Sequence, residues 1–85
     1  MTGDEGKLGF TAYFLTTRER ADRARIAIEW IERTVRRPEH QSEQADGRIR
    51  CWARVPEAGN RWLRVVVLAD RRTVHNAFFD RGFEL

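Results

Sequence analysis

The sequence is poor in the residues that form disulfides and metal sites. Its 85 residues include one cysteine, Cys51, and two histidines, His40 and His75. A single cysteine has no partner for an internal disulfide, and the Cys and His spacing of a zinc site is missing. The sequence also lacks a glycine-rich loop between a strand and a helix and a Gly-x-Ser-x-Gly motif. We therefore expect no metal, no cofactor, and neither metal-dependent nor covalent catalysis.

Long apolar runs are also absent. No stretch has the length of a membrane span, and the polar, acidic N-terminus does not resemble a signal peptide. We expect a flexible tail over residues 1–9 and one domain over residues 10–85, because a chain of this length has room for a single small core. Cys51 alternates with apolar residues, which favours a small core residue in a reducing compartment over the alternative, a reactive thiol. The prediction is a soluble, cytoplasmic protein with no membrane partner.

Lysine is almost missing, since arginine outnumbers it fifteen to one. The charges are also segregated along the chain. Residues 48–81 contain eight arginines against three acidic residues, a charge of +5, whereas residues 38–47 contain three acidic residues and no basic one, a charge of −3. A GC-rich genome explains the ratio equally well, but it does not explain the segregation. Arginine binds phosphate through two parallel hydrogen bonds and stacks on bases, so the segregation favours nucleic-acid binding.

The first half of the chain predicts one strand followed by helical structure. Residues 10–15 are aromatic and β-favouring, which is typical of a strand. Thr16 and Glu19 have the spacing of a capping box, which predicts a helix from Thr17 to the residue before Pro38. The apolar pattern allows one helix or two, and we favour two short helices with a bend near Arg25. Residues 39–47 are predicted to be a polar, mobile loop.

The second half predicts three consecutive strands. Residues 48–55 alternate between apolar and polar side chains, residues 56–60 have the length of a hairpin loop, and residues 62–69 and 73–79 follow as strands. The resulting order, β-α-(α)-β-β-β, indicates an α+β fold in which one or two helices pack on one face of an antiparallel sheet.

Arginines and one tryptophan share the outward face of residues 48–55. There Arg50, Trp52 and Arg54 have the arrangement of a surface that holds phosphates while a base stacks on the indole, which is worth roughly 1–3 kcal/mol per base. The alternative is a solvated face on which arginine stems shield the tryptophan. The expected nucleic-acid-binding residues are Arg18, Arg20, Arg50, Trp52, Arg54 and Arg64.

His75 is the candidate general acid/base. An ordinary histidine pKa near 6.5 suits proton transfer from a ribose 2′-OH or to a leaving oxygen, and Arg81 is expected to stabilise the transition state. Strict alternation places His75 with Ala77 and Phe79, opposite Val74. His75 is therefore either a site residue or a hydrogen-bonded core histidine. His40, in the acidic loop, is expected to be inert.

Three segments carry a resemblance to a known family: residues 26–39, residues 63–67 and residues 75–81. Together they resemble a small bacterial domain family of unknown function that is similar to the RelE/ParE-like toxins. The resemblance implies two helices on an antiparallel sheet, an acidic antitoxin as partner and, for the ribonuclease members, cleavage of RNA such as ribosome-bound mRNA. The ParE-like members act on DNA gyrase.

One departure from this family bears on activity. Relatives often have a histidine at the start of the first helix, where this chain has Thr16, Thr17 and Arg18, so binding without cleavage is an alternative. The sequence thus predicts a toxin-like RNA-binding protein acting as a metal-independent endoribonuclease. The alternative is a non-catalytic interaction domain that presents a basic sheet face to an acidic protein or a nucleic acid.

Overall fold

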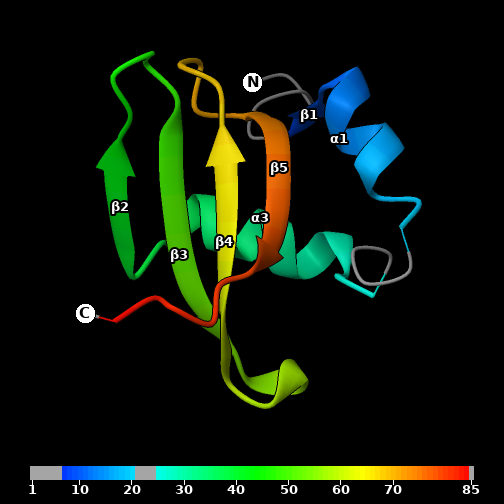
Figure 1. Ribbon diagram of the computed structural model, residues 1–85, viewed down its shortest axis with the longest axis vertical. Coiled ribbons are helices and arrows are strands. Elements are labelled where there is room, and N and C mark those ends of the chain that lie inside the picture. Colours follow the sequence, from blue (N-terminus) through cyan, green and yellow to red (C-terminus); the bar gives the residue numbers. More distant parts are fainter. Residues whose placement is uncertain (1–6, 21–24, 85) are drawn as a thin grey trace.

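The protein is a five-stranded sheet with a helix packed across one face (Figure 1). The computed structural model describes residues 7–20 and 25–84. In chain order, its elements are β1 (Gly9–Phe10), α1 (Ala12–Thr17), α3 (Ile28–Arg36), β2 (His40–Glu43), β3 (Ile49–Val55), the 3-10 turn η1 (Pro56–Ala58), β4 (Arg61–Val67) and β5 (Thr73–Phe79). The strand order is β1-β5-β4-β3-β2, with β1 parallel to β5 and all other neighbours antiparallel. Helix α3 packs on β3 and β4, and α1 packs beside β5.

The core lies between α3 and the sheet face below it. Alternation along each strand sends every second side chain to this face. Ile31 and Thr34 of α3 are buried against it, and the hydroxyl of Thr34 donates to the carbonyl of Trp30 at 2.8 Å. The buried sheet residues on this face are Ile49, Cys51, Ala53, Val55, Leu63, Val65, Val67, Val74 and Ala77. The α+β class predicted from the sequence is confirmed.

Cys51 belongs to this core, as predicted. Its side chain is buried, and burial raises the pKa of its thiol, while the positive charge of Arg71 acts in the opposite direction. A thiol with a raised pKa carries little of the nucleophilic thiolate form. Cys51 is therefore a packing residue and not a reactive group.

The prediction of a strand over residues 10–15 is wrong, because α1 occupies most of this segment. Thr11 adopts an extended conformation, and its hydroxyl oxygen accepts the backbone N–H of Phe14 at 3.1 Å, so it caps α1. Phe14 is buried, while Tyr13 and Leu15 remain exposed. Aromatic residues favour strands because they pack against neighbouring strands. Here a short helix buries one aromatic ring, Phe14, in the core instead.

The predicted capping box at Thr16 and Glu19 is also wrong. Thr16 lies inside α1, the hydroxyl of Thr17 donates to the carbonyl of Phe14, and Arg18 is already the C-terminal cap. The helix that ends before Pro38 begins at Ile28 and not at Thr17, so residues 17–37 do not form one continuous helix. Residues 21–24, which would decide the structure just before the predicted bend near Arg25, lie outside the described residues, as do residues 1–6 of the predicted tail. The end of the helix before Pro38 is confirmed.

The acidic segment after Pro38 is a strand and not the predicted loop. Strand β2 pairs with β3 along its whole length, from His40 opposite Trp52 to Glu43 opposite Ile49. Backbone hydrogen bonds form a strand whatever its side chains are, and polar side chains on an edge strand discourage pairing with other chains. The sheet consequently has five strands and not four. Because β1 is parallel to β5, it is mixed and not wholly antiparallel.

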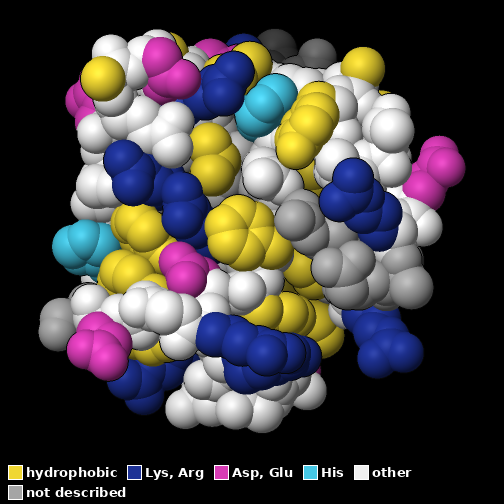
Figure 2. Space-filling view, viewed as in Figure 1, with side chains coloured by type: hydrophobic (Ala, Val, Ile, Leu, Met, Phe, Trp, Pro, Cys, Tyr) yellow, Lys and Arg dark blue, Asp and Glu magenta, His cyan; other side chains and the backbone are white. Residues whose placement is uncertain are grey.

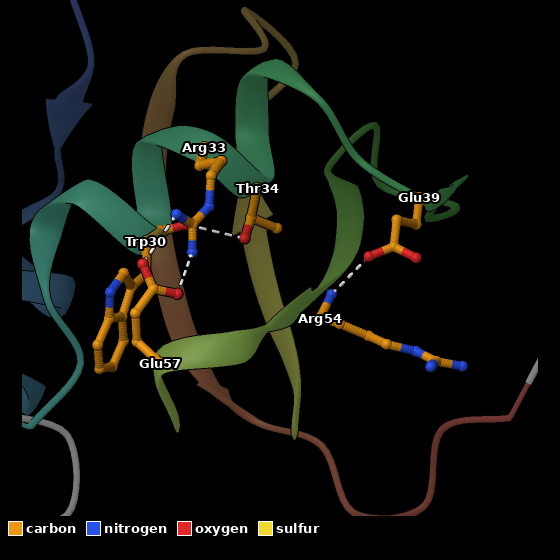
Figure 3. Close-up of polar contacts among 6 residues, drawn as sticks. All are labelled: Trp30, Arg33, Thr34, Glu39, Arg54 and Glu57. Carbon is orange, nitrogen blue, oxygen red and sulfur yellow. Dashed lines mark hydrogen bonds and ion pairs between the residues drawn. The ribbon is translucent and has the colours of Figure 1, made fainter. Parts of the chain in front are cut away.

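The three strands predicted from residues 48–79 are confirmed with small changes at their ends. The hairpin between β3 and β4 contains two residues with positive φ, Gly59 at 74° and Asn60 at 62°. These are the residue types that adopt this conformation at low cost. Arg33 of α3 binds the hairpin through two hydrogen bonds to Glu57, of 2.9 and 3.1 Å (Figure 3). These bonds lower the pKa of the Glu57 carboxyl and attach α3 to the hairpin.

Candidate nucleic-acid interface

The face of the sheet opposite α3 carries alternating arginine and aromatic side chains. We call it the open face and define it by Arg50, Trp52, Arg54, Trp62 and Arg64. Register places Trp52 opposite Arg64 and Arg54 opposite Trp62, so each aromatic residue faces an arginine on the neighbouring strand. Figure 2 shows this face, with arginine side chains in dark blue beside hydrophobic side chains in yellow. Arg50, Trp52 and Arg54 lie on the face away from α3, as the alternation in the sequence predicted.

Trp52 lies on the open face but is not exposed. Trp52 is only 6% exposed, because the ring of Phe83 stacks on the indole with centroids 4.6 Å apart and planes 15° apart. The indole Nε1 donates to Asp80 Oδ2 at 3.0 Å. The expected free indole is wrong, and the alternative of shielding by arginine stems did not include a covering aromatic ring. The chain instead returns after β5 and covers Trp52 with its own aromatic ring.

Arg64 is held within the open face by its neighbours. Its guanidinium carbon lies 5.6 Å from the centre of the Trp52 ring and 5.2 Å from that of Phe78. Its Nη1 lies 3.8 Å from Asp80 Oδ2, and the side chain is 25% exposed. With an aromatic ring on each side and a carboxylate at its end, Arg64 is less available to a phosphate than the sequence suggested.

Arg50 and Arg54 fit the predicted phosphate-binding role better. No carboxylate among the described residues lies within ion-pair distance of either guanidinium. Arg54 is exposed, and its guanidinium carbon lies 4.8 Å from the centre of the Trp62 ring. Glu39 accepts the backbone N–H of Arg54 at 2.8 Å, and Figure 3 shows the Arg54 side chain extending away from α3. A guanidinium that stacks on a ring through its face keeps its N–H edge for a phosphate.

His75 is displaced from strict alternation by a β-bulge. Val66 pairs with Asn76 and Val67 pairs with Val74, so His75 has no partner on β4. Val74 points into the core, and alternation then sends His75 to the other side, separate from the buried Ala77. His75 is half-buried and is not a core histidine. The sequence offered no signal for this bulge.

The histidine ring is fixed by two residues near the start of the chain. Its Nδ1 lies 3.1 Å from the hydroxyl of Thr11, and its ring stacks on Tyr13 with centroids 4.8 Å apart. Partial burial lowers the pKa of His75, and the positive charge of Arg48 lowers it further, while Asp46 acts in the opposite direction. A lowered pKa keeps the ring neutral near pH 7, which is the form that accepts a proton.

This lowered pKa predicts a pH dependence of stability. The unfolded chain, with a histidine pKa near 6.5, takes up a proton before the folded protein does, so stability falls as the pH drops from about 6.5 through the pKa of the folded state. We expect the melting temperature of His75→Gln to fall less between pH 7 and pH 5 than that of the parent. Thermal melting of both proteins over this range measures the difference. Identical pH profiles would contradict the lowered pKa.

The other predicted site residues do not lie beside His75. Arg81 follows the far end of β5, and the strand from His75 to Phe79 already spans roughly 13 Å. Arg81 lines a shallow pocket of about 260 Å³ with Arg61, Trp62, Phe79 and Asp80. The structure therefore does not bring the predicted catalytic residues His75 and Arg81 together.

Arg18 and Arg20 also lie away from the centre of the open face. Arg18 ends α1, with its guanidinium carbon 5.9 Å from the centre of the Phe14 ring, and Arg20 lies in the turn that follows. Since α1 packs beside β5, both arginines are at that edge of the sheet.

Sequence reasoning missed four residues that shape the site. Thr11 and Tyr13 fix His75, while Asp80 and Phe83 cover Trp52. Thr11 was detectable as an N-cap three residues before Phe14. The other three act through contacts between distant parts of the chain, which no local pattern records.

The comparisons with known proteins do not assign the chain to a family. The chain matches no protein-family model, no curated protein and no solved structure. The resemblance to RelE/ParE-like toxins and the acidic antitoxin it implies therefore stay predictions. No helix in the described part of the chain is long and apolar enough to cross a membrane. Within residues 7–20 and 25–84, no group of three His, Cys, Asp or Glu side chains is placed to hold a metal ion.

Proposed function

We propose that the open face binds single-stranded RNA. The observation that carries this proposal is that the exposed Arg54 of β3 lies over Trp62 of β4. Arg50 lies on the same face of β3. Arg50 and Arg54 lie four residues apart on the same face of β3, a separation of roughly 13 Å, so they can hold two separate phosphates of one backbone. The partly exposed ring of Trp62 supplies a surface on which an unpaired base can stack, and unpaired bases are available in single strands but not in duplexes.

Salt dependence tests this proposal. With three or four phosphates neutralised, log K is expected to fall with log salt concentration with a slope of roughly −2 to −3, because each phosphate contributes about −0.7 for single strands. Arg50→Ala and Arg54→Ala should each make the slope less steep by about 0.7. The slope is measured by fluorescence anisotropy of a labelled 12-nucleotide RNA at salt concentrations from about 25 to about 200 mM.

Arg36→Ala is the matched control, because it removes the same charge from α3 on the opposite side of the sheet. Its slope should equal that of the parent. Absence of binding at low salt would overturn the proposal. Equal slopes for the open-face variants and the parent would place the RNA elsewhere on the molecule.

Cleavage of the bound RNA is a second candidate function, favoured by the arrangement around His75. The neutral ring is held in one orientation by Thr11 and Tyr13, with the positive charge of Arg48 acting on it. A neutral histidine can accept the proton of a ribose 2′-OH while a nearby arginine stabilises the developing charge on the phosphate. In this candidate Arg48 takes the role that the sequence assigned to Arg81.

A further inference from the structure

The ring of Phe83 sits in a slot built by the sheet itself. Its floor is Trp52, 4.6 Å away and nearly parallel. Trp62 meets Phe83 edge-on at 4.9 Å, and His40 lies 5.5 Å from it. Trp52, Trp62 and His40 come from β3, β4 and β2, whereas Phe83 belongs to no strand. The residues that line the slot therefore belong to the sheet, whereas the ring that fills it belongs to the segment after β5.

The segment that carries Phe83 is anchored mainly at its beginning. Asp80 donates its backbone N–H to the carbonyl of Trp62 at 2.9 Å and accepts the indole N–H of Trp52. Beyond Asp80, the backbone N–H groups of Gly82 and Phe83 have partners only within the segment, as far as the described residues go: both bond to Asp80, at 3.2 and 3.4 Å. Figure 1 shows this segment crossing the ends of the strands on the open face. Phe83 can thus leave the slot without breaking any strand pairing.

Two positively charged side chains lie beside the slot, where they can attract the phosphate of a nucleotide. The guanidinium of Arg54 lies over Trp62 at one wall, and Arg64 lies beside Trp52 at the floor. A nucleobase is a planar ring that stacks on an indole, and its phosphate would lie within reach of Arg54. An aromatic side chain of a partner protein would fill the slot but would make no use of the arginines.

We propose that the Trp52 slot is a binding site for an unpaired nucleobase and that Phe83 occupies it in the ligand-free protein. This inference rests on the RNA-binding function proposed above. Phe83 then competes with the base from within the same molecule, at the high effective concentration that a short connection gives. The base enters as Phe83 leaves, and no covalent step is involved.

Removal of the competing ring tests the proposal. Phe83→Ala is expected to bind a labelled 12-nucleotide RNA about 5-fold more tightly than the parent or better, since one stacked base contributes at least ~1 kcal/mol. Phe83→Trp keeps a ring in the slot and should bind no more tightly than the parent. Trp52→Leu combined with Phe83→Ala removes the floor and should abolish the gain. Thermal melting of each variant confirms that it is folded.

The choice of probe separates stacking from charge. An oligonucleotide with the same backbone but without bases should show no gain with Phe83→Ala, whereas single-stranded DNA should show a gain like that of RNA. An equal gain with the abasic probe would overturn the base site, because the substitution would then act by uncovering arginines.

The remaining outcomes distinguish this inference from the proposed function. Salt-dependent RNA binding by the parent with no gain in Phe83→Ala overturns the base site and leaves RNA binding standing. Binding by Phe83→Ala where the parent does not bind overturns RNA binding by the parent and supports a base site that Phe83 occludes. Absence of binding by both proteins at low salt overturns both proposals.

Discussion

Replacing Leu63 by alanine is expected to lower the free energy of unfolding by about 2–5 kcal/mol. Leu63 lies on the central strand β4, between Ala53 of β3 and Phe79 of β5, and is completely buried beneath α3. The substitution removes buried apolar surface and leaves a cavity that the paired strands cannot close. In a domain of this size each kcal/mol shifts the melting temperature by about 4–8 °C, so thermal melting detects the loss readily.

Leu15→Ala is the matched control for this prediction. It makes the same chemical change on α1, where the leucine side chain is 54% exposed. Its effect on the free energy of unfolding should stay within about 0.5 kcal/mol. Similar losses for the two variants would contradict the placement of the core between α3 and the sheet.

The second large effect is expected at His75 under the cleavage candidate. If His75 moves a proton at the scissile phosphate, His75→Gln should lower the cleavage rate by about 10²–10⁴-fold while RNA affinity stays close to that of the parent. Under this proposal Arg50 and Arg54 hold the RNA and His75 does not, so the affinity should be retained. Cleavage rates with and without ribosomes, RNA affinity and thermal melting are measured on the same preparations of His75→Gln and His75→Ala.

Three results have distinct meanings in this experiment. A folded variant that cleaves as fast as the parent removes His75 from the mechanism. A loss of activity that follows a loss of melting temperature assigns His75 a structural role through Thr11 and Tyr13. No cleavage by the parent, with or without ribosomes, would overturn the cleavage candidate and leave RNA binding as the proposed function.

The elements with a regular side-chain period were predictable. Strand β3 alternates strictly, the hairpin contains Gly59 and Asn60, and β4 is almost wholly apolar, so their positions followed from local rules. The buried face of α3, with Ile31 and Thr34, was also visible as a helical stripe. Each of these signals lies within a few neighbouring residues.

The elements without such a period were predicted wrongly. Residues 10–15 have the composition of a strand but form α1, because one buried ring and the cap at Thr11 suffice for a short helix. Residues 40–43 have the composition of a loop but form β2, because β3 offers its free edge to their backbone. In both segments the neighbouring part of the structure outweighs the local preference.

By itself, the sequence determined that β3 has two different faces. A strand turns successive side chains to opposite sides, so Ile49, Cys51 and Ala53 had to be buried together if Arg50 and Arg54 stayed in water. Only the tertiary structure decided which groups on the open face are accessible. Phe83 covers Trp52, and a bulge in β5 turns His75 out of the core. Both depend on contacts between segments far apart in the chain, and those contacts exist only once the sheet has formed.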